Sequence, residues 1–140
     1  MKKIGISKAV KKRKRFNKIF KDIKNVKIQG ASNISKKALE AYYLFPGKKS
    51  LKKLLKLRPT EPMLENVLKK ASKGEDKKDI LSHFQKAQEK INSLVYSKIK
   101  NNSIVFTHCH STNVVNALIE AKKRGKNFQV YNTETRPLYQ

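Results

Sequence analysis

The sequence has few of several residue types, and each shortage excludes a class of protein. It contains one cysteine, Cys109, so no disulfide can form within the chain. No apolar run reaches the roughly 18 residues that a membrane span needs, and no apolar segment follows the basic N-terminus as in a secretory signal. Tryptophan is absent, and acids number only 10 among the 140 residues. We therefore expect a cytoplasmic protein without disulfides and without a membrane partner.

Basic residues are what the sequence has in excess. The 34 lysines and arginines give a formal net charge of +24. Residues 2–24 hold eleven of them against one acid, Asp22, and residues 8–15 are the densest part. One hypothesis is a basic N-terminal arm over residues 1–13 that binds nucleic acid through counterion release. The other is a lysine-rich composition that only solvates helix surfaces, because aromatic residues are not interleaved with the basic run as a stacking platform would need.

The first two thirds of the chain have the apolar period of amphipathic helices. We expect helices over residues 10–24, from Ser32 or Asn33 to just before Pro46, over 51–57 and over 76–99. A further helix should begin near Thr60, as its N-cap, with Pro62 in its first turn. The long helix over 76–99 carries an apolar row that predicts packing against the other helices: Ile80, Phe84, Ala87, Ile91, Leu94 and Val95.

Beyond residue 103 the pattern changes to that of a strand, a helix and a second strand. Residues 104–107 and 128–131 are β-branched and aromatic runs typical of buried parallel strands, and the helix between them should close at Gly125. The three elements fit within about 30 residues, the usual length of one βαβ unit. We predict a mainly α N-terminal helical module followed by the first βαβ unit of a truncated Rossmann-like α/β domain. The expected boundaries are a basic arm over 1–13, a helical domain over 14–102 and the start of the α/β domain over 103–140.

The candidate chemistry lies at the turn after the first strand, where the sequence reads His108-Cys109-His110-Ser111-Thr112. Ligands of parallel α/β sheets bind at the carboxyl ends of the strands, and a helix N-terminus there attracts anions. The same dipole would favour the thiolate of Cys109, which predicts a phosphate site beside a reactive thiol. The alternative is that Ser111 only caps the helix and that Cys109 is a small buried residue. Three consecutive residues cannot wrap a tetrahedral ion, and the only other histidine is His83, so we expect no metal and no cofactor.

Four stretches of the sequence, in this order, resemble one known family. They are Asp22-Ile23-Lys24 leading into Ile28-Gln29-Gly30-Ala31, Leu57-Arg58-Pro59-Thr60-Glu61-Pro62, Thr107-His108-Cys109-His110-Ser111, and Val130-Tyr131-Asn132-Thr133-Glu134-Thr135-Arg136-Pro137. They resemble the family that unites the alpha, beta and delta subunits of translation initiation factor 2B with sugar-phosphate isomerases. The third stretch is most similar to the archaeal ribose-1,5-bisphosphate isomerases of this family, and less similar to the methylthioribose-1-phosphate isomerases.

This resemblance implies an aldose–ketose isomerisation, from ribose 1,5-bisphosphate to ribulose 1,5-bisphosphate, in nucleotide salvage. The ligand would then be a phosphorylated sugar or nucleotide. The resemblance implies that Cys109 is a catalytic proton-transfer residue and that Arg58 is an anion contact. The implied phosphate contacts are Ser111, Thr112 and Asn113, and the implied loop that closes over the substrate is Gln29, Gly30, Ala31 and Ser32.

Two departures from the family keep a second interpretation open. The isomerases usually carry arginine where this chain has Gln29, and the family's larger C-terminal domain, with its catalytic aspartate, would follow Gln140. We therefore expect a gene fragment or one half of a split protein, inactive alone, that forms a homo-oligomer or pairs with a complementing C-terminal chain. The alternative is a translation initiation factor 2B-type regulatory subunit without catalytic activity.

Overall fold

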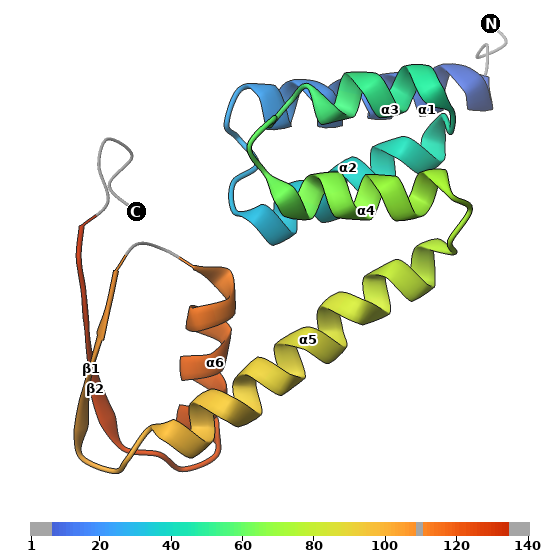
Figure 1. The fold of residues 1–140 in the computed structure, drawn as a ribbon. Helices are drawn as coiled ribbons and strands as arrows, with labels where there is room; N and C mark the ends of the chain where they lie inside the picture. The colour runs from blue at the N-terminus through green and yellow to red at the C-terminus, as the bar shows by residue number, and fades with distance from the viewer. Residues whose placement is uncertain (1–6, 109–110, 135–140) are drawn as a thin grey trace, which may run out of the picture. The chain divides into compact units, whose positions relative to one another are not determined.

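The computed structural model describes residues 7–108 and 111–134, and in this part of the chain it contains six helices and two strands (Figure 1). Contacts divide the chain into two compact units, Met1–Leu81 and Ser82–Gln140, which we call the helical unit and the βαβ unit. No helix within the described ranges is long and apolar enough to cross a membrane. The order of elements confirms the predicted fold class of a helical module followed by a βαβ unit.

Four helices pack together in the helical unit: α1 (Lys8–Lys24), α2 (Ala31–Leu44), α3 (Lys48–Leu55) and α4 (Pro62–Ser72). The apolar row expected on the first helix is confirmed, because Phe16, Ile19 and Ile23 are buried. Leucines from the other three helices complete the core, and all of them are almost fully buried: Leu39, Leu54, Leu64 and Leu68. Each helix therefore hides one apolar face and leaves its lysines in water.

All four helices begin at other residues than the sequence predicts: α1 begins at Lys8 rather than at residue 10, and α3 covers Lys48–Leu55 rather than 51–57. The caps of the other two also differ. The N-cap of α2 is Gly30, whose carbonyl accepts a hydrogen bond from the Ile34 N–H at 3.0 Å, so the expected cap at Ser32 or Asn33 is wrong. Gly30 has φ +79°, a left-handed conformation that glycine adopts without steric cost, and this lets the helix start earlier. In α4 the N-cap is Glu61 rather than Thr60, while Pro62 occupies the first turn as expected.

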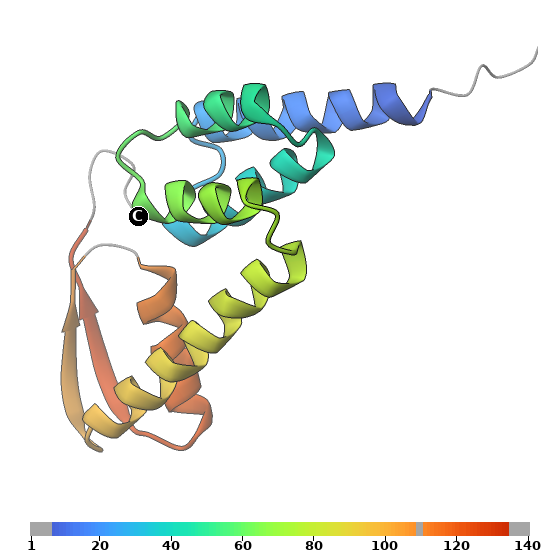
Figure 2. The same ribbon diagram turned by 45° about the vertical axis from the view of Figure 1, so that its right-hand side comes forward.

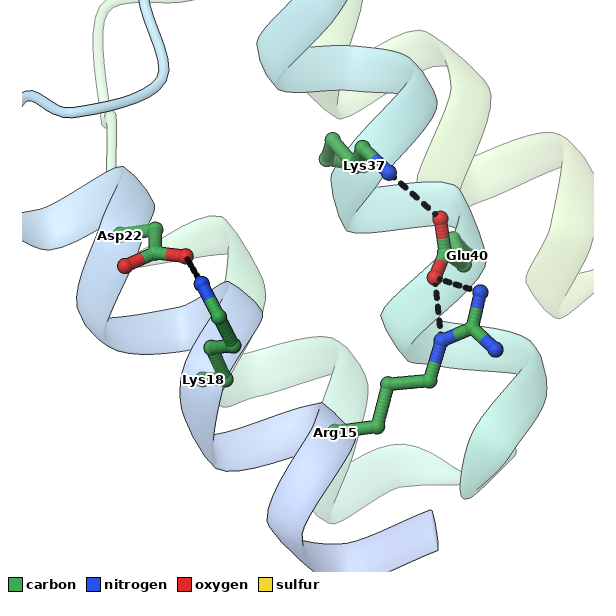
Figure 3. A network of polar contacts seen from close by, with 5 residues as sticks. All are labelled: Arg15, Lys18, Asp22, Lys37 and Glu40. Atoms are coloured by element: carbon green, nitrogen blue, oxygen red, sulfur yellow. Dashed lines mark hydrogen bonds and ion pairs between the residues drawn. The ribbon is translucent and has the colours of Figure 1, made fainter.

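Charged side chains connect α1 to α2 at the edge of the core. Nε and Nη2 of Arg15 lie 2.7 Å and 2.6 Å from Oε1 of Glu40, and Lys37 Nζ lies 3.0 Å from its Oε2 (Figure 3). Burial pushes the pKa of Glu40 up, but hydrogen bonds and charges from Lys37 and Arg15 outweigh it and hold the pKa below its ordinary value of 4.5. A separate pair on α1 joins Lys18 to Asp22 at 2.7 Å.

The long helix α5 (Lys77–Lys98) begins in the helical unit and ends in the βαβ unit. Asp76 starts it, because its carboxylate accepts a hydrogen bond from the Lys78 N–H at 2.6 Å and its carbonyl accepts one from Ile80. The expectation that its whole apolar row packs against other helices is wrong. Ile80 is buried, but Leu94 is 64% exposed, because the row continues beyond the helical unit that covers its start.

The βαβ unit contains β1 (Ser103–Thr107), α6 (Thr112–Lys123) and β2 (Phe128–Asn132). The strands pair in parallel, from Ser103 opposite Phe128 to Thr107 opposite Asn132, and α6 runs alongside them in both views (Figure 1 and Figure 2). Two N–H···O bonds close α6, from Gly125 to the Lys122 carbonyl and from Lys126 to the Ala121 carbonyl. Gly125 has φ +90°, which confirms it as the residue that ends the helix.

Candidate functional site

Polar side chains meet at the carboxyl ends of the two parallel strands. Thr107 and Asn132 are partners in the strand register, and the Thr107 hydroxyl donates to Asn132 Oδ1 at 2.9 Å. One residue further along, Nδ1 of His108 lies 2.7 Å from the Thr133 hydroxyl oxygen, and the Thr133 N–H donates to the Thr107 carbonyl at 3.3 Å. These bonds hold both strand ends in one arrangement at the edge where α/β folds bind ligands.

The N-terminus of α6 follows this edge in the sequence. Ser111 is its N-cap, in extended conformation, and its carbonyl accepts a hydrogen bond from Val115 at 2.9 Å. Its side chain makes no capping bond within the described residues, so the hypothesis that Ser111 serves only as a side-chain cap gains no support. Thr112 and Asn113 form the first turn, where backbone N–H groups have no partner within the helix and carry the positive end of the dipole.

A contact from α5 fixes the first turn of α6. Nε2 of Gln88 donates to the Asn113 carbonyl at 3.1 Å, and the same nitrogen donates to Asn92 Oδ1 at 2.7 Å. Because Gln88 bonds the carbonyl of Asn113, the N–H of Asn113 stays available at the N-terminus of α6. The start of α6 is thus held in place by a side chain that is itself held on α5, which suits a preorganised anion site.

Cys109 lies outside the described residues, as does His110, so the catalytic role expected for Cys109 stays a prediction. The nearest described residues on either side of it, His108 and Ser111, are both exposed. Among the described residues there is no group of His, Cys, Asp and Glu that could hold a metal ion.

The remaining predicted site residues belong to the helical unit. Gln29, Ala31 and Ser32 are half-buried around exposed Gly30 at the N-terminus of α2. Arg58 is half-buried in the turn between α3 and α4, and its Nε has no hydrogen-bond partner within the described residues. The structure thus assigns the predicted site residues to two units: the Gln29–Ser32 loop and Arg58 to one, and Ser111, Thr112 and Asn113 to the other.

We call the hydrogen-bonded residues at the strand ends the strand-end cluster: Thr107, His108, Asn132 and Thr133. Three of them lie outside the turn that the sequence predicted as the site: Thr107, Asn132 and Thr133. A signal for them exists in the sequence, because each ends or follows one of the predicted strands. The rule that ligands bind at the carboxyl ends of parallel strands applies to both strands alike. Applied to the second strand as well as the first, it would have identified Asn132 and Thr133.

Comparison with known proteins gives relatives of two descriptions. The ribose 1,5-bisphosphate isomerase of Methanocaldococcus jannaschii is 31% identical, over 84% of this chain and 46% of the relative. That of Thermococcus kodakarensis is 29% identical, over 87% of this chain and 48% of the relative. A Pyrococcus furiosus protein described as a putative translation initiation factor eIF-2B subunit 2-like is 30% identical, over 88% of this chain and 51% of the relative. The chain spans about half the length of these curated relatives.

A solved structure and a family profile complete the comparison. The crystal structure of the Pyrococcus horikoshii OT3 translation initiation factor eIF-2B has the same fold, with a TM-score of 0.69 and 21% identity over 89% of this chain and 52% of that one. The profile of the Initiation factor 2 subunit family matches residues 47–140, which include α3 to β2 and the strand-end cluster. The profile covers most of the chain, and the resemblance seen in its motifs is confirmed: the chain belongs to the initiation factor 2 subunit family.

Proposed function

We propose that the chain supplies the phosphate-binding part of an aldose–ketose isomerase that converts ribose 1,5-bisphosphate to ribulose 1,5-bisphosphate in nucleotide salvage. The observation that carries the proposal is that the hydrogen-bonded strand ends are followed, three residues after His108, by the N-terminus of α6. The names of several relatives support the choice of substrate. In this proposal one phosphate of the substrate binds at Ser111, Thr112 and Asn113.

Physical chemistry favours a phosphate at this place. The N–H groups of the first turn of α6 are donors without helical partners, and the helix dipole adds an attraction of about 0.3–1 kcal/mol for an anion. The Ser111 hydroxyl, which makes no capping bond within the described residues, adds a donor at the same end. A dianionic phosphate would accept both kinds of hydrogen bond. The resemblance implies that Arg58 is a further anion contact, and its Nε has no hydrogen-bond partner within the described residues.

The reaction opens the ring bond between C1 and O4, moves the hydrogen of C2 to C1 and passes the proton of the C2 hydroxyl to O4, so it requires no external oxidant or reductant. By the resemblance, Cys109 is one of the two groups that transfer the proton, and its place just before α6 would lower the pKa of its thiol. The family's second group is an aspartate of the C-terminal domain. We therefore propose that the 140 residues do not turn over substrate by themselves. Turnover should be restored when a chain that supplies this domain is added.

Calorimetric titration of the chain with ribose 1,5-bisphosphate, and with ribose as the uncharged control, tests the phosphate site. We expect binding of the bisphosphate and none of ribose. Ser111→Ala should weaken binding about tenfold, the cost of a hydrogen bond to a charged group. The matched control is Ser97→Ala, because the Ser97 hydroxyl donates to the Leu94 carbonyl of its own helix, far along the sequence from Ser111. Equal affinity of both variants, or no bisphosphate binding at all, would contradict the proposal.

A turnover assay, which measures the ribulose 1,5-bisphosphate formed, tests the proton-transfer step. The C-terminal half of the Methanocaldococcus jannaschii relative, added to this chain, should produce ribulose 1,5-bisphosphate. Cys109→Ser should abolish that turnover while leaving bisphosphate binding within about twofold, because a hydroxyl has too high a pKa to replace the thiolate. Full turnover by Cys109→Ser would remove Cys109 from the mechanism.

The second candidate function is that of an initiation factor 2B-type regulatory subunit. Gln29, where the isomerases usually carry arginine, favours it, and so does the description of the Pyrococcus furiosus relative. The substitution Gln29→Arg separates the two. If the site is that of an isomerase, the added charge should raise the affinity for ribose 1,5-bisphosphate severalfold; no binding before or after the change would favour the regulatory subunit.

A further inference from the structure

A cavity of about 530 Å³ opens between α1 and α3, two helices that lie side by side in both ribbon views (Figure 1 and Figure 2). It lies wholly within the helical unit, and none of the predicted phosphate-site residues lines it. We call it the basic cavity, because five of its lining residues are cations and none is an acid. The five are Arg13, Lys49, Lys52, Lys53 and Lys56.

The lysines of α3 reach the cavity because of their spacing. Lys49, Lys52, Lys53 and Lys56 stand at positions i, i+3, i+4 and i+7, which is one face of a helix. Leu54, on another face, is fully buried and holds α3 against the core. At a rise of 1.5 Å per residue, the row of lysines is about 10 Å long, enough to contact more than one phosphate of a strand.

These five cations have no acidic partner in the described part of the chain. The described ion pairs use other lysines and arginines, namely Arg15, Lys18, Lys37, Lys69 and Lys70. Five like charges around one cavity repel one another, and an anion that binds there would relieve that repulsion. Cations that served only to keep the surface solvated would not need to line one cavity.

An aromatic ring completes the cavity. Phe45, the C-cap of α2, lines it and is 36% exposed. Its ring meets that of buried Phe16 edge to face, with the centroids 5.8 Å apart, so it is held in position from below. Cations beside a positioned aromatic ring are the combination with which proteins bind single-stranded nucleic acid, the cations on phosphates and the ring against a base.

We propose that the basic cavity binds single-stranded RNA, with backbone phosphates on the five cations and one base against Phe45. The first half of α1, which supplies Arg13 to the cavity, adds further positive charge nearby along the chain, because Lys8, Lys11, Lys12 and Lys14 are exposed. The hypothesis of a nucleic-acid contact at residues 8–15 thereby gains a partner helix and an aromatic ring. An acidic peptide would use the cations but gains nothing specific from Phe45.

Fluorescence anisotropy of a labelled 12-nucleotide oligouridylate, titrated with the full chain, tests this proposal. If five phosphates are contacted, log K should fall with log salt at a slope of about −3.5. Lys49→Gln/Lys53→Gln should weaken binding about tenfold or more at 0.1 M KCl and reduce the slope to about −2. Lys98→Gln/Lys123→Gln is the matched control, because it removes the same charge from exposed lysines outside the cavity and should change affinity less than threefold.

The aromatic contact is tested separately. Phe45→Leu should weaken binding severalfold, and Phe45→Tyr should restore it, because a base stacks on either ring. Circular dichroism melting of each variant shows whether the helical unit remains folded. Equal weakening by the two lysine pairs would mean diffuse charge attraction and overturn the proposal. So would equally tight binding of a polyglutamate peptide of the same charge, which would make the partner an acidic protein.

Discussion

In the helical unit most of the large apolar side chains are buried, whereas in the βαβ unit several of them face water. Ile23, Leu39, Leu54, Leu64 and Leu68, the largest fully buried apolar residues among those described, all belong to the helical unit. On the strands, Ile104 is 68% exposed, Phe106 is 70% exposed and Tyr131 is 56% exposed. Parallel sheets normally have both faces covered, so the chain combines a helical unit that has a buried core with a βαβ unit that is poorly buried and carries the strand-end cluster.

The largest expected effect removes part of the better-buried core. Leu68→Ala should lower the free energy of unfolding of the helical unit by about 2–5 kcal/mol, because Leu68 is fully buried and its loss leaves a cavity. Leu94→Ala, the same change at a 64% exposed site, should cost less than about 0.5 kcal/mol. Urea unfolding followed by circular dichroism measures both. A similar loss of unfolding free energy in Leu68→Ala and Leu94→Ala would contradict the difference in burial between the two sites.

The next effect concerns the covered side of the βαβ unit. Ala117 on α6 is fully buried, so Ala117→Leu should cost about 1–3 kcal/mol by overpacking. That cost is large for a unit with so little buried surface, and we expect the NMR amide signals of β1, α6 and β2 to lose dispersion while those of α1 to α4 stay. Ala9→Leu, at an exposed position of α1, should leave the spectrum unchanged. Loss of dispersion in both units would show that they fold as one.

A smaller effect is expected where α5 begins. The Tyr43 hydroxyl donates to the Glu75 carbonyl, and Tyr43→Phe should cost about 0.5–1.5 kcal/mol. Burial, and then the nearby charge of Asp76, raise the pKa of Tyr43 above 10. Because the pKa of Tyr43 is raised in the folded state, the stability that Tyr43 contributes is present below pH 10. It is lost as the pH rises through the folded-state pKa of Tyr43. Thermal melting between pH 8 and pH 11 should therefore show a loss in the wild type that is smaller in Tyr43→Phe.

The smallest effect concerns the ion pairs between α1 and α2. The pKa of Glu40 is held below 4.5, so the stability that these pairs contribute is present above that pH and is lost as the pH falls through the lowered value. We expect less than about 1 kcal/mol, because the cations are exposed. Melting temperatures from pH 6 to pH 3 should fall less in Glu40→Gln than in the wild type. The control Glu65→Gln, which affects only the exposed pair with Lys69 within α4, should follow the wild type.

The elements themselves were largely predictable from the sequence, because they depend on short-range periodicity. The expected helix over 76–99 is α5 (Lys77–Lys98), and the strands at 104–107 and 128–131 extend by one residue each. The helix starts were not predictable in detail. Ser32 and Asn33 are better N-cap residues than glycine by side-chain chemistry, but the left-handed turn at Gly30 decides where α2 begins. Burial of Leu94 depends on which other elements cover α5, which periodicity does not encode.

The site was predictable at one strand and missed at the other. Ser111, Thr112 and Asn113 follow a recognisable strand-to-helix turn, and the structure indeed begins α6 there. Thr107, Asn132 and Thr133 gain their importance only from the parallel register, which brings Thr107 opposite Asn132. The basic cavity was also not predictable, because the convergence of Arg13 with the lysines of α3 depends on how two helices pack.

Amide hydrogen exchange of the full chain, with and without ribose 1,5-bisphosphate, tests most directly the claim that the ligand site lies on the less buried unit. We predict strong protection of α1 to α4 in both samples and weak protection of residues 104–131 in the free chain. The bisphosphate should slow exchange in the first turn of α6 and at the strand ends, because binding stabilises the unit that holds the site. Strong protection of residues 104–131 without ligand, and no change on adding it, would contradict this account.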